Sequence, residues 1–331
     1  MSDSQAWLIT LEEHWLSKYV QEYYVKQGKP DPYSGPAFDN FRSVLKTVGE
    51  IRITDNEKGR VRLQVISHGP NTIPIDATTC IAANDELAQA ISHHSERYRG
   101  FALLPIDDPA AAATELSRAV TQLGFVGAMI DNTTEGRFYD DEFFWPICAA
   151  AEKLDVPIYL HPSYNEQTAV ILYKGNYSPV IARSLSTNGW GWHAECGTHF
   201  LRLYASGLFD KYPRFKLVLG HMGEMLPFQL DRVAHWVETM WREGPKRSLR
   251  SVWDENVWIT TSGMFSLSPA ACLLRQCKPD RICYSVDYPF ASNEAGLKFM
   301  EELRTSGLVS VEQLEAIAYG NAAKLLNLEL S

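Results

Sequence analysis

The sequence predicts a closed (β/α)8 barrel, and three observations support this fold class. Short runs rich in Val, Ile and Leu alternate with helical stretches along the 331 residues. The connections between these runs are long, unlike the tight turns of hairpins, which favours a parallel sheet. Several runs end directly in His, Asp or Glu, as strands do at the end of a barrel where chemistry occurs. A doubly wound open sheet is the alternative. A dinucleotide-binding version of it is disfavoured because no strand leads into Gly-x-Gly-x-x-Gly.

The individual elements follow from local pattern. We expect strands at residues 7–11, 61–66, 101–105, 125–130, 156–160, 216–219, 257–261 and 281–286. We expect helices at 84–97 with Asn84 as the N-cap, from Asp108 and Pro109 onward, at 141–154, 196–209 and 226–241, and in a tail from residue 293 that breaks near Gly307.

Two long insertions follow the first and fifth strands. Residues 15–60 have no regular pattern and are rich in Tyr, Phe and Pro, and residues 162–192 resemble a long loop or a broken helix. Loops of this length are usually lids or partner contacts, although residues 15–60 could equally pack over their own barrel end. We treat residues 1–331 as one domain.

Composition excludes several classes of function. The net charge is −9 and there is no basic stripe, so nucleic acid is not an expected partner. No apolar run is long enough to span a bilayer, and Met1–Gln5 does not begin a signal peptide. The six cysteines contain no Cys-x-x-Cys pair, which favours a reducing compartment such as the cytoplasm.

Polar side chains at four strand ends are the candidate site. Glu12 and His14 follow the first strand, two residues apart on one side of it, while His161, His221 and Asp287 end the fifth, sixth and eighth strands. A barrel brings its strand ends together, and imidazoles with carboxylates form a site for a first-row metal ion. Each residue alone has a structural explanation, such as a polar turn or an N-cap. His68, His193 and His199 are not assigned, although the Trp190–His193 loop could line a pocket.

The segments that contain these residues resemble the decarboxylase branch of the amidohydrolase superfamily, which includes γ-resorcylate, 2,3-dihydroxybenzoate and 5-carboxyvanillate decarboxylases. The similar segments are LEEHW at 11–15, YLHP at 159–162, LGHMGEMLPFQLDR at 219–232, ITTSG at 259–263, SVDYPF at 285–290 and YGNAAKLL at 319–326.

The resemblance implies a site with a single metal. It implies one divalent ion, Zn, Mn or Mg, bound by Glu12, His14, His161 and Asp287. Met129 on the fourth strand, where binuclear relatives have a lysine, supports one ion. The resemblance also implies that His221 is catalytic and that Arg232 orients His221 or the substrate carboxylate. A homodimer or homotetramer is implied as well.

The expected function is therefore non-oxidative decarboxylation of an ortho-hydroxybenzoate, without an organic cofactor. Asp287, with His221 beside it, is expected to protonate the ring carbon, and Phe290, Trp190, Trp192 or Tyr288 to stack on the ring. Two alternatives remain: hydrolysis of a lactone or amide by metal-bound hydroxide, and a barrel kept only as a scaffold. The product distinguishes the two enzymes, and loss of metal ligands would indicate the scaffold.

Overall fold

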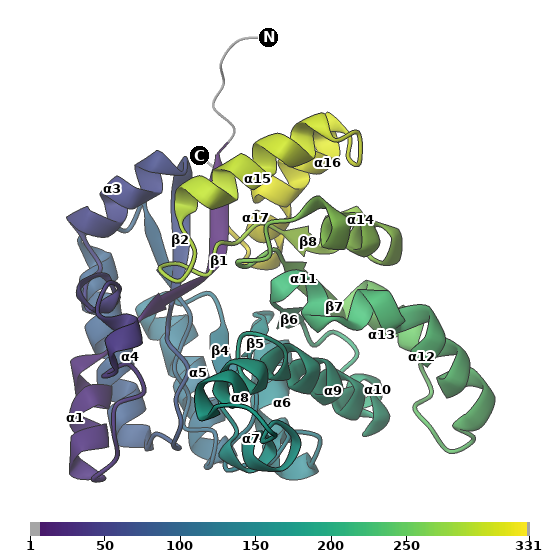
Figure 1. Ribbon diagram of the computed structural model, residues 1–331, viewed down its shortest axis with the longest axis horizontal. Helices are drawn as coiled ribbons and strands as arrows, with labels where there is room; N and C mark the ends of the chain where they lie inside the picture. The colour runs from purple at the N-terminus through teal and green to yellow at the C-terminus, as the bar shows by residue number, and fades with distance from the viewer. Residues whose placement is uncertain (1–6, 330–331) are drawn as a thin grey trace.

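The computed structural model describes residues 7–329, so Met1–Gln5 lies outside the described part of the chain. Its centre is a ring of parallel strands with helices on the outside (Figure 1). The strands are β1 (Leu8–Trp15), β2 (Val61–His68), β3 (Tyr98–Gly100), β4 (Ala128–Asp131), β5 (Ile158–His161), β6 (Leu217–Leu219), β7 (Val257–Thr260) and β8 (Ile282–Cys283).

Strand pairing closes the ring. Strands β1 to β3 pair in chain order in one sheet, and strands β4 to β8 do so in a second. Two isolated parallel bridges join the sheets, one between Ala102 and Ala128 and one between Glu13 and Tyr288. The predicted closed barrel is confirmed, and the open sheet is wrong.

Helices follow the strands around the outside of the ring. They are α4 (Ala77–Ser92), α5 (Pro109–Leu123), α6 (Trp145–Leu154), α9 (Gly191–Ala205), α10 (Leu208–Lys211), α11 (His221–Glu224), α12 (Leu226–Met240), α13 (Leu249–Asn256), α14 (Leu267–Gln276), α15 (Asn293–Thr305), α16 (Val311–Glu315) and α17 (Asn321–Leu325). Short 3-10 or π turns occur at Pro36–Phe38, Glu142–Phe144, Pro279–Arg281 and Ala316–Gly320.

Two predicted helix starts have different outcomes. Helix α5 begins as expected, with Asp108 as its N-cap and Pro109 in its first turn. The prediction that Asn84 caps a helix is wrong, because α4 begins at Ala77 and Asp76 caps it. Asn84 is buried within α4, and its amide nitrogen donates to the carbonyl of Leu103 at 2.9 Å. The Asn84 side chain, predicted to cap a helix, therefore makes a tertiary hydrogen bond instead.

Two strands are displaced from their expected positions. The third strand pairs at 98–100 and not at 101–105, where only Ala102 makes a bridge. The fourth strand begins three residues later than expected and extends to Asp131, which pairs in register with His161. The later strand end places an acidic side chain at the same level as the strand-five histidine.

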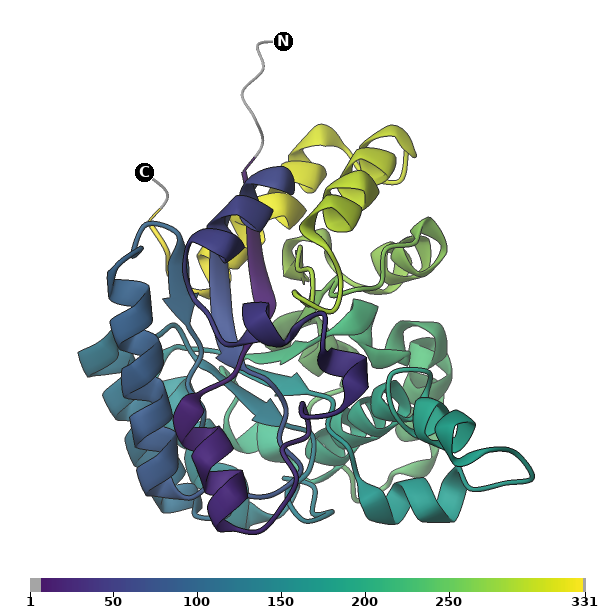
Figure 2. The same cartoon turned by 60° about the vertical axis from the view of Figure 1, so that its left-hand side comes forward.

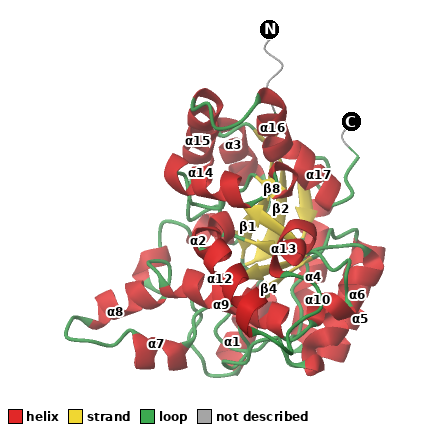
Figure 3. Cartoon of the chain, turned by 90° about the vertical axis from the view of Figure 1, so that its right-hand side faces the viewer, coloured by secondary structure: helices red, strands yellow, loops and turns green. Residues whose placement is uncertain are grey.

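Both long segments contain helices. Residues 15–60 were expected to be irregular, but Trp15 ends β1, and the rest includes α1 (Lys18–Lys26), α2 (Arg42–Leu45) and α3 (Glu50–Lys58). This segment runs across the front of the barrel in Figure 2. Residues 162–192, expected to be a long loop or a broken helix, contain α7 (Glu166–Leu172) and α8 (Pro179–Ser186) and reach the start of α9. Figure 3 shows α7 and α8 extending away from the body of the molecule.

The core has two main parts. Side chains that include Leu11, Val65, Phe101 and Tyr159 fill the barrel interior. A larger cluster lies between the strands and the outer helices. Burial of the apolar surface in these two clusters is the main favourable contribution to folding. Among the described residues no helix has the length and apolar character to cross a membrane.

Candidate active site

Four predicted side chains converge at the carboxyl ends of the strands. One ligand atom from each of Glu12, His14, His161 and Asp287 lies within 4.8 Å of the others. His161 Nε2 is 3.1 Å from Glu12 Oε1, and His14 Nε2 is 3.1 Å from Asp287 Oδ1. The barrel thus brings together residues as distant as positions 12 and 287.

The donor atoms of this cluster fit a divalent cation. Glu12 Oε1 and both ring nitrogens of His14 are buried without a hydrogen-bond partner. Leaving such atoms unsatisfied costs about 1–3 kcal/mol each, and a bound cation would remove that cost. Burial raises the pKa of Glu12, but His221 and then His161 outweigh burial and lower the pKa well below its ordinary value. Glu12 is therefore a carboxylate, and two carboxylates with two imidazoles suit a metal such as Mn or Zn.

Glu13 fixes the position of Asp287. The side chain of Glu13 points away from the cluster, because neighbours along a strand alternate. Its carboxylate accepts hydrogen bonds from the backbone N–H of Val286 at 3.2 Å and of Tyr288 at 3.0 Å. Asp287 lies between them with a φ of 67°, a left-handed conformation that is uncommon outside glycine. The first strand therefore fixes the residue that completes the cluster.

A fifth side chain, His221, lies beside the cluster on the turn after β6. Its Nε2 is 3.5 Å from Glu12 Oε1 and 3.9 Å from Asp287 Oδ2. Its Nδ1 is 2.7 Å from Glu224 Oε1, and the other oxygen of Glu224 is 2.8 Å from Nδ1 of His193. Burial lowers the pKa of His221, but Glu12 and Glu224 outweigh it and raise the pKa well above 6.5. His193 was not assigned from the sequence. The signal that could have found its neighbourhood is Glu224, which lies in the recognised segment 219–232 and contacts both histidines.

Tyr159 is a contact that sequence reasoning missed. This buried residue of β5 donates its hydroxyl hydrogen to Glu12 Oε2 and lies 2.6 Å from the hydroxyl of Thr260. A Cβ atom at Gly220 would approach Glu12 Oε2 to 2.8 Å and the Tyr159 hydroxyl to 2.9 Å. Glycine at position 220 therefore leaves room for the contact between Tyr159 and Glu12, because a larger residue would displace the Glu12 carboxylate.

A cavity of about 550 Å³ opens above the cluster. Its floor includes His14, His161, His221 and Asp287. The aromatic part of its wall includes Phe290, which lies 5.6 Å from the His14 ring between ring centroids. The wall also comes from both long segments, through residues Tyr33, Phe38, Arg183 and Trp192. A flat aromatic acid of one ring suits this combination of apolar walls and a charged floor.

Three predicted residues lie elsewhere. Trp190 is 51% exposed and does not line the cavity, whereas Trp192 does. Tyr288 is buried on the other side of β1, where its hydroxyl donates to Asp55 Oδ2 at 2.7 Å. Arg232 is exposed on α12 and lines another depression, whose wall also includes Glu224. The structure places none of these three side chains in the wall of the cavity, and their roles toward the substrate or His221 stay predictions.

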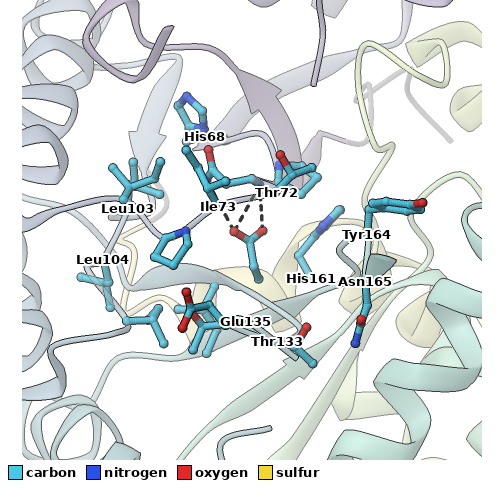
Figure 4. A pocket seen from close by; sticks show the side chains of 18 of the residues that line it. His68, Thr72, Ile73, Leu103, Leu104, Thr133, Glu135, His161, Tyr164 and Asn165 are labelled. Atoms are coloured by element: carbon cyan, nitrogen blue, oxygen red, sulfur yellow. Dashed lines mark hydrogen bonds between the residues drawn. The ribbon is translucent and has the colours of Figure 1, made fainter. Parts of the chain in front are cut away.

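A second cavity, which no sequence pattern predicted, lies beside the first. It has a volume of about 210 Å³ and shares Asn71, Thr72, His161 and Tyr164 with the larger cavity. Figure 4 shows His161 and Tyr164 on one side of it and Leu103 and Leu104 on the other. Asp131 lines it, and burial raises the pKa of Asp131 to about 6.

A barrel of this kind with a carboxylate and histidine cluster at its strand ends is typical of metal-dependent amidohydrolases. The amidohydrolase family model matches residues 61–328, and the chain belongs to this family. Its relatives place it in the aromatic-acid decarboxylase branch of the superfamily.

Three relatives show that likeness. Decarboxylase orsB of Emericella nidulans is 44% identical over 327 residues, which cover 98% of both chains. A γ-resorcylate decarboxylase of Polaromonas sp. is 35% identical over 84% of this chain and 89% of its own. The crystal structure of a dihydroxybenzoic acid decarboxylase from Polaromonas sp., with bound manganese and the inhibitor 2-nitroresorcinol, superposes with a TM-score of 0.85. That structure is 31% identical and covers 98% of each chain.

Proposed function

We propose that this protein is a metal-dependent, non-oxidative decarboxylase of an ortho-hydroxybenzoate-type acid. The observation that carries the proposal is the cluster of Glu12, His14, His161 and Asp287 on the floor of an aromatic-lined cavity, with His221 beside it. The relatives with known activities support it, because they act on aromatic acids of this class.

The proposed metal ligands are Glu12, His14, His161 and Asp287. A bound divalent cation would supply a Lewis acid for the carboxylate and the ortho-oxygen of the substrate. We propose that one ion suffices and that no organic cofactor takes part. Among Zn, Mn and Mg, the manganese in the relative's structure favours Mn, and mixed nitrogen and oxygen ligands are compatible with it.

The side chains of this chain would then move one proton. Cleavage leaves the carbon–carbon bonding pair on the ring and releases CO2, and the same ring carbon must gain a proton. Asp287 faces the cavity with its side chain 19% exposed, and His221 lies 3.9 Å from its Oδ2. His221, held by Glu224, is the proposed source of a proton for Asp287, and the protonated Asp287 is the proposed donor to the ring carbon. Phe290 and Trp192 would hold the ring flat.

The test is turnover of hydroxybenzoates by the manganese-loaded protein, followed as CO2 release and as deuterium incorporation at the former carboxyl carbon. Removing a general acid typically costs 10²–10⁴-fold, so we expect D287N to lose about that much in kcat. The control is D140N, a carboxylate that pairs with Arg202 on the surface. Undiminished labelling by D287N would contradict the role of Asp287. If hydroxybenzoates release no CO2 and the protein instead opens an added lactone or hydrolyses an added amide, the hydrolase alternative is established.

We further propose that the chain forms a homodimer or homotetramer through α7 and α8. Large apolar side chains of these helices are exposed, up to 78% for Val180: Val170, Ile171, Leu172, Ile181 and Leu185. Patches of this kind usually mark contact surfaces. Light scattering after size-exclusion chromatography tests this, with I171D and V180D expected to shift the protein to the monomer mass.

We also propose that residues 1–331 act as one domain in the cytoplasm. All six cysteines are unpaired and five are buried, which suits a reducing compartment. Limited proteolysis that leaves one resistant fragment, and fractionation of the source cells, test these two statements.

A further inference from the structure

A fully buried arginine, Arg52, lies on α3 within the long segment that follows β1. Its side chain has no exposed surface, and α3 packs against β2 (Figure 1). The Nη1 atom of Arg52 is buried without a hydrogen-bond partner. Taking a charged group out of water costs free energy, and an apolar side chain of similar volume is often at least as stable. The stability of the fold alone therefore does not explain an arginine at this position.

Arg52 binds the backbone of His14. Its Nη2 donates to the carbonyl oxygen of His14 at 2.7 Å, and the N–H of His14 donates to the carbonyl oxygen of Tyr288 at 2.7 Å. In a regular parallel ladder the N–H and the C=O of one residue bond to the same neighbouring strand. Here the neighbouring segment supplies only the acceptor, because its pairing with β1 is limited to the bridge at Tyr288. Arg52 supplies the missing donor.

The same helix also holds the residue that follows Asp287. The guanidinium carbon of Arg52 lies 4.9 Å from the centroid of the Tyr288 ring, a cation–π contact. The Tyr288 hydroxyl donates to Oδ2 of Asp55 at 2.7 Å, and Asp55 lies one helical turn after Arg52. Helix α3 therefore contacts both segments that bring His14 and Asp287 together, with His14 Nε2 3.1 Å from Asp287 Oδ1.

The ring of His14 has no second hydrogen bond to orient it. A histidine that binds a metal through one nitrogen usually donates its other N–H to a carbonyl or a carboxylate. His161 fits this pattern, because its Nδ1 is 2.7 Å from the carbonyl oxygen of Pro162. In contrast, Nδ1 of His14 is buried without a partner. The position of the His14 ring therefore depends on its backbone, which Arg52 and Tyr288 hold.

We propose that Arg52 is a positioning residue for the metal site, which holds His14 beside Asp287 through the carbonyl oxygen of His14. The inference rests on the proposed function, because it takes His14 and Asp287 as metal ligands. It also gives a role to residues 15–60, which supply a fixed support for the cluster in addition to part of the cavity wall.

The experiment measures the Mn affinity of the wild type, R52M and R52K by competition with a chelator. Methionine fills the space without a donor, whereas lysine keeps the charge and one donor group. We expect R52M to bind Mn about 10–100-fold more weakly and R52K to recover part of the loss, as for other residues that support a metal ligand.

The matched controls are R247M and R247K. Arg247 also donates to a backbone carbonyl, that of Phe209 at 3.2 Å, and it binds Asn256 directly before β7, at the opposite end of the barrel. These variants lose or alter similar contacts away from the cluster. We therefore expect them to bind Mn within about twofold of the wild type.

A second readout separates positioning from a general loss of stability. Cobalt(II) in place of Mn has visible absorption bands that depend on the geometry of the ligands. We expect the spectrum of cobalt-saturated R52M to differ from that of the wild type, the spectrum of R52K to lie between them, and that of R247M to be unchanged. Thermal unfolding shows whether each variant is folded, and R52K decides the matter if R52M does not fold.

Affinities and cobalt spectra of R52M and R52K equal to those of the wild type would overturn the inference, and so would an equal loss of Mn affinity in R247M. CO2 release is measured on the same proteins, so that the two proposals can fail separately. Weaker Mn binding by R52M in a protein that decarboxylates no hydroxybenzoate would contradict the proposed function and leave the role of Arg52 standing. CO2 release with equal Mn affinity in wild type and R52M would retain the function and refute the role. A wild type that binds no Mn would overturn both.

Discussion

The hydroxyl of Tyr159 donates a hydrogen bond to Oε2 of Glu12, while Oε1 of the same carboxylate lies 3.1 Å from Nε2 of His161. Tyr159 therefore holds Oε2 in place, and Oε1 faces the cluster without a hydrogen-bond partner. Orientation of this kind is how a protein fixes a ligand before the ion binds.

We expect Y159F to weaken metal binding. Removing a group that orients a ligand typically costs 10–100-fold in metal affinity, and Phe preserves the ring that fills the barrel. The measurement is competition for Mn between the protein and a chelator. The control is Y204F, which also removes a buried hydroxyl, here bound to the carbonyl of Arg247. Equal affinities in wild type and Y159F would show that Tyr159 only fills space.

Removing the metal is expected to destabilise the protein. This loss of stability should depend on Glu12, because Glu12 is a proposed ligand. A ligand at 100 times its Kd stabilises a folded protein by about 2.7 kcal/mol. For a chain of this size that amounts to several degrees in Tm. Adding Mn to the chelated wild type should therefore raise Tm, and adding it to E12Q should not. A Tm that rises equally in E12Q would place the ion elsewhere.

Two neighbouring tryptophans should differ in their effect on the substrate. Trp192 lines the active-site cavity, and its indole nitrogen is buried without a partner, whereas Trp190 is 51% exposed. We expect W192A to raise KM about tenfold or more, because an aromatic wall is lost, and W190A to leave it within about twofold. Steady-state kinetics with a hydroxybenzoate decide the matter. The reverse ranking would mean that the loop takes another conformation in the complex.

Stability should fall in mild acid because of His199. Its Nε2 accepts the backbone N–H of Tyr139 at 3.0 Å, and burial lowers the pKa of His199 to about 3. The unfolded chain, with an ordinary pKa near 6.5, binds a proton that the folded protein excludes. The contribution of neutral His199 to the free energy of unfolding is therefore fully present above pH 6.5. It is lost as pH falls toward 3, by up to about 1.4 kcal/mol per pH unit.

The variant H199Q tests this by the slope of the unfolding free energy between pH 6.5 and 5. Denaturant titrations of the wild type should show a steeper fall than those of H199Q, whatever the difference in absolute stability. His68, whose pKa burial lowers to about 4, contributes the same slope to both proteins and cancels in the comparison. Parallel slopes would show that His199 is not excluded from protonation.

The sequence alone determined the ring of strands and the residues at their ends. Apolar runs followed at once by Glu12, His14, His161, His221 and Asp287 are local patterns, and closure of a barrel brings any such ends together. The family resemblance rested on the same segments. Strand limits were less certain, since β3 and β4 start away from the expected positions.

Only the tertiary structure decided which neighbours of those residues face the site. Tyr288 and Trp190 follow recognised positions in the chain, yet one is buried against Asp55 and the other faces solvent. Tyr159 lies in the recognised YLHP segment and His193 in a loop that could line a pocket, but no local pattern showed their contacts with Glu12 and Glu224, which are made through β5 and α9. The physical reason is that a strand fixes where its end lies, while the direction of each side chain depends on the packing of elements far away in sequence.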